Sequence, residues 1–140
     1  MRLVLDTDVV VAALRSPRGA SAAILLAAAD GRATLLMSVP LVVEYEATCT
    51  LAEHRLAAQL SEGEIAQFLD GLAALAEPVD SHFLWRPQLR DPGDEMVLEA
   101  AVNGRADAIV TFNVRDYGGG PAKFGVAVLK PAEALRRIEK

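Results

Sequence analysis

Short apolar segments alternate along the chain with longer segments whose apolar residues recur at helical spacing. The short segments have the length and composition of buried strands, and they are RLVLD (2–6), ATLLMS (33–38), DAIVTF (107–112) and FGVAVLK (124–130). Strands that alternate with helices are typical of a parallel sheet with helices on both faces. We therefore expect an α/β fold: a three-layer α/β/α sandwich with a central parallel sheet of about four to five strands.

Polar residues mark where several of the expected helices begin. Asp6 or Thr7 is suited to cap a helix that follows the first strand. SEGE (61–64) is a capping box, and DPGD (91–94) places an aspartate before a proline, as at the start of a helix. The segment PVDSHFLWRP (78–87) has neither pattern, so we expect it to be extended or irregular.

Composition narrows the class of protein. A chain of 140 residues with 52% hydrophobic residues fits one folded domain, 1–140. Its longest apolar run, AAILLAAA (22–29), is far shorter than the ~20 residues that span a bilayer, so we expect no membrane partner. The single cysteine suits a reducing compartment, and the expected location is the cytoplasm. A net charge of −5 argues against a nonspecific nucleic-acid coat, although a nuclease can concentrate carboxylates to hold metal ions.

Two aspartates, Asp6 and Asp8, end the first apolar run, and they resemble the opening motif of haloacid-dehalogenase-type phosphatases. In that interpretation Asp6 is the nucleophile and Asp8 the general acid. IVT (109–111) could supply the second motif of such a phosphatase. The order of the remaining motifs is wrong, because Lys130 is followed only by two glutamates of a terminal helix and no acidic pair comes after it.

A phospho-acceptor receiver domain is a second interpretation of the same acids. It too has acids after the first strand, a threonine after a late strand and a Lys-Pro near the end, here Lys130-Pro131. It also needs an acceptor aspartate at the end of a middle strand. The segment ATCTLAEHRLA (47–57) is helical in pattern and contains no aspartate. The receiver interpretation therefore lacks its central residue.

The third interpretation rests on acids that a parallel sheet would bring to one edge. Asp6 ends the first strand, Glu44 lies in the helix after the second, Asp94 is in the first turn of the DPGD helix, and Asp116 follows the strand 107–112. Carboxylates gathered at one edge repel each other unless cations neutralise them. Hard oxygen ligands suit Mg²⁺ or Mn²⁺, and the matching chemistry is metal-assisted phosphodiester hydrolysis.

These residues resemble the PIN-domain ribonucleases, including VapC-type toxins of bacterial toxin–antitoxin pairs. The resemblance begins at DTDVVVAAL (6–14), continues through SVPLVVEYE (38–46) and is densest in WRPQLRDPGDEMVLEAAVNGRADAIVTFNVRDY (85–117). It implies a PIN-like fold and a Mg²⁺- or Mn²⁺-dependent RNA endonuclease. It also implies RNA as the substrate, a small antitoxin protein as a partner, and a homodimer or higher homo-oligomer.

By that resemblance Asp6, Glu44 and Asp94 match the first three acids, which hold metal. Asp116 is the expected fourth acid, but Asn113 stands where some relatives carry aspartate, and the choice between the two stays open. Asp8 departs from the family, which usually has asparagine there. It either adds to the metal ligands or bonds backbone amides as the asparagine would.

Other residues near these acids are expected to support the site. Asp91 could share the role of Asp94, but its preferred assignment is the helix N-cap. The remaining candidates are three hydroxyls and two arginines that could contact phosphate: Thr7, Ser38, Thr111, Arg90 and Arg115. The alternative to an enzyme is a PIN-like fold kept as a binding or regulatory module. The fourth metal ligand distinguishes such a module from a nuclease, because a site with only three carboxylates is expected to bind metal poorly.

Overall fold

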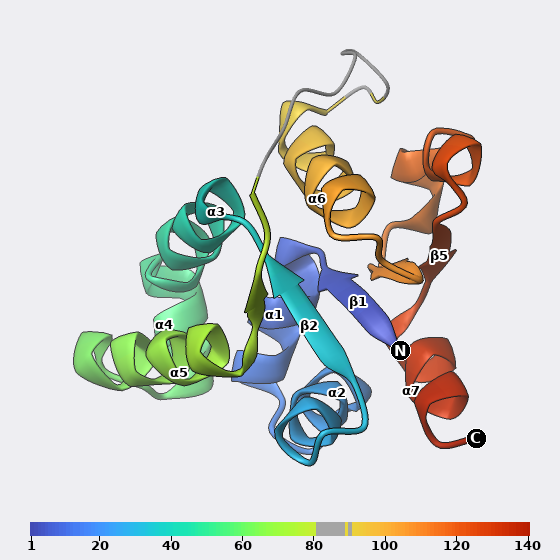
Figure 1. The fold of residues 1–140 in the computed structure, drawn as a ribbon. Helices are drawn as coiled ribbons and strands as arrows, with labels where there is room; N and C mark the ends of the chain where they lie inside the picture. The colour runs from blue at the N-terminus through green and yellow to red at the C-terminus, as the bar shows by residue number, and fades with distance from the viewer. Residues whose placement is uncertain (81–88, 90) are drawn as a thin grey trace.

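The protein forms a five-stranded, all-parallel sheet with helices on both faces, as the sequence predicts (Figure 1). The structure is a computed structural model, and it describes residues 1–80, 89 and 91–140. The strand order is β3-β2-β1-β4-β5. The strands are β1 (Arg2–Leu5), β2 (Thr34–Met37), β3 (Glu77–Pro78), β4 (Ala108–Val110) and β5 (Ala127–Leu129).

The helices divide between the two faces of the sheet. The α-helices are α1 (Thr7–Arg15), α2 (Ala20–Ala29), α3 (Val39–Cys49), α4 (Ala52–Ala58), α5 (Glu62–Leu75), α6 (Pro92–Asn103) and α7 (Pro131–Ile138). Two short 3₁₀ helices, η1 (Val114–Tyr117) and η2 (Pro121–Phe124), connect β4 to β5. In Figure 1, α6 lies on one side of the sheet and α2 and α7 on the other; α6 packs against β1, β2 and β4, and α2 packs against α1 and α7.

The central strand β1 lies at the point where the strand order reverses. Leu3 is paired with Leu35 of β2 on one side and with Ala108 of β4 on the other. From β1 the chain passes to β2, whereas β4 is reached only after β3 and α6. A ligand crevice forms at such a reversal, beyond the carboxyl ends of the strands. The residues that follow β1 and β4 are Asp6 and Thr111, so this topology brings them together.

The predicted helix starts are confirmed, and side chains satisfy the first amide groups of these helices. The Asp6 carboxylate accepts a hydrogen bond from the Thr7 N–H at 2.8 Å. Ser61 and Glu64 form the reciprocal capping box of α5. Asp91 caps α6 by accepting from the Gly93 N–H at 2.8 Å. Aspartate and serine are favoured at these positions because their side-chain oxygens accept hydrogen bonds from first-turn N–H groups that have no backbone acceptor within the helix.

The strand β3 begins within sequence that showed no strand pattern. The segment 78–87 is expected to be extended or irregular, and its first residue is extended: Pro78 pairs with Met37 in parallel register, and the Val79 N–H donates to the Met37 carbonyl at 2.9 Å. Both residues of β3 are exposed. A two-residue exposed edge strand that contains proline has no apolar alternation by which it could be recognised. Residues 81–88 lie outside the described part of the chain.

Close packing fixes α6 against the sheet. Gly104 follows α6, and a Cβ atom at that position would lie 2.9 Å from side-chain atoms of Leu36 and Val79. It would also lie 2.9 Å from the Ala100 carbonyl oxygen, so a larger residue would force this turn or its neighbours to shift. The Arg2 guanidinium donates two hydrogen bonds to the Gly104 carbonyl, at 3.2 and 2.8 Å, so the same turn is also tied to β1.

In the described ranges, no single helix is both long and apolar enough to cross a bilayer. The two helices α1 and α2 meet that composition only when taken together, and they are bent by 96° at the break between them.

Candidate functional site

The Asp6 carboxylate is fixed at the carboxyl end of β1. It is 9% exposed, and its Oδ2 atom accepts a hydrogen bond from the Thr111 hydroxyl at 2.8 Å. Its Oδ1 atom accepts from the Thr7 N–H. One residue earlier, the Leu5 carbonyl accepts from the buried Tyr45 hydroxyl. Asp6 is therefore held by its own helix, by β4 and, through the backbone, by α3.

Asp8 is bound by the loop that follows β4. Its Oδ2 atom accepts from the Phe112 N–H and the Asn113 side-chain amide, both at 3.1 Å, and from the Thr111 hydroxyl at 3.4 Å. Its Oδ1 atom is buried and has no hydrogen-bond partner within the described residues. Asp8 therefore bonds a backbone amide, as expected if it replaces asparagine, and its other oxygen is buried without a hydrogen bond from any described residue.

Carboxylates from three separate parts of the sequence lie close enough to oppose each other's ionisation. Burial raises the pKa of Asp8 to about 6, and the Asp6 charge adds to this shift. The pKa of Asp94, in the first turn of α6, is also raised to about 6. Burial is the main cause there, followed by the charges of Asp6, Asp91, Asp116 and Asp8. The predicted acids 6, 94 and 116 are therefore brought into one cluster.

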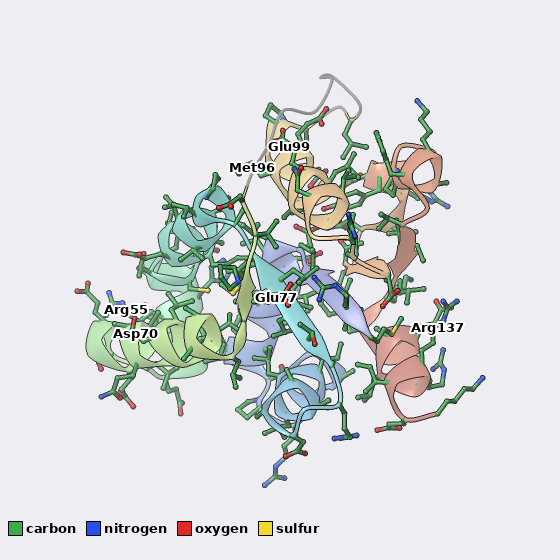
Figure 2. The ribbon with its side chains drawn as sticks, viewed as in Figure 1. Arg55, Asp70, Glu77, Met96, Glu99 and Arg137 are labelled. Atoms are coloured by element: carbon green, nitrogen blue, oxygen red, sulfur yellow. The ribbon has the colours of Figure 1, made fainter. Side chains whose placement is uncertain are left out.

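Glu44 lies in a cleft between α3 and α6 with a volume of about 510 Å³. Its lining residues are Ser38, Pro40, Glu44, Asp91, Pro92, Gly93, Met96 and Glu99. Figure 2 shows Met96 and Glu99 on α6, on the side of that helix that faces α3. Asp91 connects this cleft to the acidic cluster, because it lines the cleft and its charge raises the pKa of Asp94. The Glu44 carboxylate is half-buried and accepts from the Thr48 hydroxyl at 3.4 Å.

The structure separates the two candidates for the fourth acid. The Asn113 side chain donates to Asp8, whereas the charge of Asp116, in η1, raises the pKa of Asp94. Asn113 thus orients an acid, and Asp116 adds to the acidic cluster.

The supporting residues occupy different positions. Ser38 caps α3 through the Leu41 N–H at 3.4 Å and lines the cleft. Thr7 contributes its backbone N–H, and Thr111 contributes the hydroxyl described above. Arg115 is exposed on η1, beside Asp116. Arg90 lies outside the described residues.

Sequence reasoning missed two buried tyrosines of the site. Tyr117 is fully buried; its hydroxyl lies beside the Asp6 carboxylate but forms no hydrogen bond of ordinary geometry in the described ranges. Burial raises the pKa of this phenol far above its ordinary value, and the charges of Asp6, Asp94 and Asp8 raise it further, so the ring lies beside the acidic cluster. Tyr45 holds the end of β1. The sequence offered one signal for both tyrosines, because each directly follows a candidate acid: Tyr117 follows Asp116, and Tyr45 follows Glu44.

The carboxylate oxygens of the site are ligands of the type that a hard divalent cation prefers, but the described side chains are not arranged around one point. The clustered carboxylates and the unused Asp8 oxygen are the ligands that Mg²⁺ or Mn²⁺ prefers. Across residues 1–80, 89 and 91–140, no three His, Cys, Asp or Glu side chains are positioned to hold one ion.

Comparison with known proteins identifies the family of the chain and a structure of similar fold. The model of the PIN domain family matches residues 2–115. A chain of the crystal structure of VapBC2 from Rickettsia felis bound to a DNA fragment from their promoter superposes with a TM-score of 0.63 and 15% sequence identity, covering 91% of this chain and 97% of that one. Comparison with the curated proteins gives no significant match. Because the family model covers most of the sequence, including Asp6, Glu44 and Asp94, the chain belongs to the PIN domain family.

Proposed function

We propose that this protein is a metal-dependent endoribonuclease, in which Asp6, Glu44, Asp94 and Asp116 hold Mg²⁺ or Mn²⁺. PIN domains are a family of nucleases and are typically metal-dependent, which supports this class of activity. The observation that carries the proposal is the acidic cluster, because Asp94 carries a pKa of about 6 under the charges of Asp6, Asp91, Asp116 and Asp8. Such mutual repulsion costs stability and is relieved when a cation binds.

Each side chain has a distinct part in the proposed reaction. When held by these acids, a divalent cation would offset the negative charge of the phosphodiester and promote the ionisation of water. Asp6 would provide an oxygen ligand whose carboxylate is held in place by hydrogen bonds from Thr7 and Thr111. Asp94 and Asp116 contribute further negative charge from α6 and η1. Asp8 holds the loop that carries Asn113, which keeps that side of the crevice in place.

The cleft between α3 and α6 supplies the access route in this proposal. It is lined by Glu44 and Asp91 and is large enough for a segment of an RNA strand. The exposed Arg115, adjacent in sequence to Asp116, is suited to contact a phosphate and so offset the repulsion between RNA and these acids.

We also propose that the protein acts in the cytoplasm as the toxin of a toxin–antitoxin pair. The fold similarity to a chain of the VapBC2 structure supports this role. A small antitoxin protein would then cover or fill the acidic site, and the toxin would pair with itself as a homodimer or higher oligomer. Co-expression with the product of a short neighbouring reading frame tests this part of the proposal: we expect it to restore growth that expression of the protein alone inhibits.

A PIN-like binding or regulatory module is the second candidate function. It is favoured by the absence, among the described residues, of three acidic or other ligating side chains positioned around one point. Weak metal affinity with tight but non-destructive RNA binding would identify this function.

Incubation of purified protein with structured RNAs, with and without Mn²⁺, tests the nuclease proposal. We expect cleavage that requires the metal and that is abolished by Asp6→Asn, because this change removes a charged ligand while leaving an oxygen that can still accept from Thr111. Equal degradation by the wild type and the variant would contradict the proposal, as would intact RNA at high concentrations of metal and protein.

A further inference from the structure

A second hollow is lined by Phe112, which directly follows Thr111 in the loop after β4. Its volume is about 320 Å³, at the lower end of the roughly 300–1,000 Å³ found for small-ligand sites. Small residues make up most of its lining: Ala12, Ser16, Gly19, Ala20, Ser21, Phe112, Lys130, Pro131 and Ala132. The backbone of Phe112 donates to Asp8, so the hollow adjoins the acidic cluster directly.

Two helices begin at this hollow, and neither has a side-chain cap. The N-cap of α2 is Gly19 and that of α7 is Lys130, and neither side chain bonds the amide groups of the first turn. In contrast, Asp6, Ser38, Ser61 and Asp91 cap α1, α3, α5 and α6. Exposed first-turn amides and the helix dipole attract anions. Two such helix starts at one hollow offer donors to the same anion from two directions.

Side chains at the hollow add donors and a stacking surface. Ser21 is 4% exposed, and its hydroxyl has no hydrogen-bond partner among the residues that the structure describes. Lys130 is exposed and makes no ion pair with any described residue. The one acid in the first turn of α7, Glu133, is paired with Arg137 at 3.2 Å. Phe112 is 47% exposed, unusual for a phenylalanine that follows a buried strand.

We propose that this hollow binds one nucleotide of the RNA chain next to the cleavage point, with its phosphate at the N-termini of α2 and α7 and at Lys130, and its base stacked on Phe112. The inference rests on the proposed nuclease function for its ligand. Phosphate matches the amides, the Ser21 hydroxyl and the lysine, and an aromatic ring stacks on any base. Because Phe112 also fixes Asp8, an occupied hollow would place the next phosphate of the chain toward the acidic cluster.

Chemical-shift mapping of the full chain with a 5′-phosphorylated RNA dinucleotide tests this site without requiring cleavage. In metal-free buffer we expect shifts in the backbone amides of Ala20, Ser21 and Ala132, and much smaller ones with the unphosphorylated dinucleotide. Inorganic phosphate alone should move the same amides at higher concentration. Shifts that are absent from these amides, or that are identical for the two dinucleotides, would overturn the proposal.

Affinity for a short single-stranded RNA, measured by fluorescence anisotropy, provides the second test. We expect Lys130→Ala to weaken binding about tenfold and to lower the slope of log affinity against log salt by about 0.7. Phe112→Ala should also weaken binding about tenfold, and Phe112→Leu less. Lys140→Ala is the matched control, because it removes the same charge at the exposed C-terminus.

The two proposals fail in different ways. If the protein cleaves RNA but Lys130→Ala and Phe112→Ala behave like Lys140→Ala, the hollow is not a nucleotide site and the nuclease function stands. If the amide shifts and affinity losses occur as expected but Mn²⁺ never induces cleavage, the nucleotide site stands and the nuclease function is wrong.

Discussion

The Thr111 hydroxyl donates a hydrogen bond of 2.8 Å to the Asp6 carboxylate across 105 positions of sequence. Asp6 follows β1 and Thr111 follows β4. These two strands are neighbours in the sheet, but the chain leads from β1 to β2 and from β4 to β5, on opposite sides of the pair. The same hydroxyl lies 3.4 Å from Asp8 and accepts from the Asn113 N–H at 3.0 Å. A single threonine therefore orients both acids of the first motif and the loop beside them.

Replacing Thr111 by valine should lower both the cleavage activity and the stability of the protein. Valine keeps the shape of the side chain but removes a donor to a charged group, a bond worth about 1.5–3 kcal/mol. We expect an RNA cleavage rate reduced at least about tenfold, with the variant still folded in thermal denaturation. Thr111→Ser, which keeps the hydroxyl, is the control and should retain most of the activity. A fully active Thr111→Val variant would show that the hydroxyl does not position Asp6.

Asp8→Asn should change how stability depends on pH. The pKa of Asp8 is raised from 3.8 to about 6 in the folded protein, so the folded state binds more protons between those values. The free energy of unfolding therefore falls as pH rises from about 4 to 6, and the penalty remains above pH 6. Asparagine removes the charge and can still accept from the Phe112 N–H.

Chemical denaturation in metal-free buffer measures this effect. We expect the Asp8→Asn variant to show a flatter pH profile than the wild type between about pH 4 and 6, and to be more stable at pH 7 by about 1 kcal/mol after solvent screening. A variant that is less stable at pH 7, with an unchanged slope, would mean that Asp8 stabilises the fold as a carboxylate.

Mn²⁺ should raise the melting temperature of the protein, and the rise should be larger at pH 7 than at pH 5. Burial and neighbouring charges raise the pKa of Asp94, like that of Asp8, to about 6, so protons compete with the cation at the lower pH. Saturation at about 100 times the Kd corresponds to about 2.7 kcal/mol of added stability. Asp94→Asn should lose most of the shift, whereas Asp70→Asn, on the exposed surface of α5, should keep it. An equal shift in both variants would place the cation elsewhere.

Tyr45→Phe should destabilise the protein and weaken the site. The Tyr45 hydroxyl, which is fully buried, donates to the Leu5 carbonyl one residue before Asp6. Phenylalanine leaves that carbonyl without its donor, at a cost of about 1–3 kcal/mol. We expect a lower free energy of unfolding by denaturant titration, together with reduced cleavage at unchanged RNA affinity. Wild-type stability would show that water replaces the lost donor.

The order and direction of the main elements could be predicted from the sequence because their signals are local. Buried strand segments such as 3–5 are unbroken apolar runs, and the caps at Asp6, Ser61 and Asp91 are oxygens placed where a helix start needs an acceptor. The strand β3 could not be predicted in this way. It has two exposed residues, and its pairing depends on where β2 ends.

The convergence of Asp6, Asp94 and Asp116 followed from topology, because each comes after a parallel strand or at the start of a helix near the same edge. What each side chain bonds did not follow. The choice between Asn113 and Asp116 depends on the loop after β4, in which the Asn113 amide donates to Asp8 and the charge of Asp116 raises the pKa of Asp94. The position of Tyr117 beside three acids likewise depends on that turn, since its sequence pattern is that of any core aromatic residue.

The rate of RNA cleavage under single-turnover conditions, measured against Mn²⁺ concentration, tests the central claim most directly. The wild type and Asp70→Asn should show the same saturable dependence on Mn²⁺, and EDTA should abolish cleavage. Asp94→Asn should cleave at least about a hundredfold more slowly at saturating metal, because the site loses a charged ligand. Cleavage that persists in EDTA, or an Asp94→Asn variant as fast as the wild type, would contradict the claim that these carboxylates hold the catalytic metal.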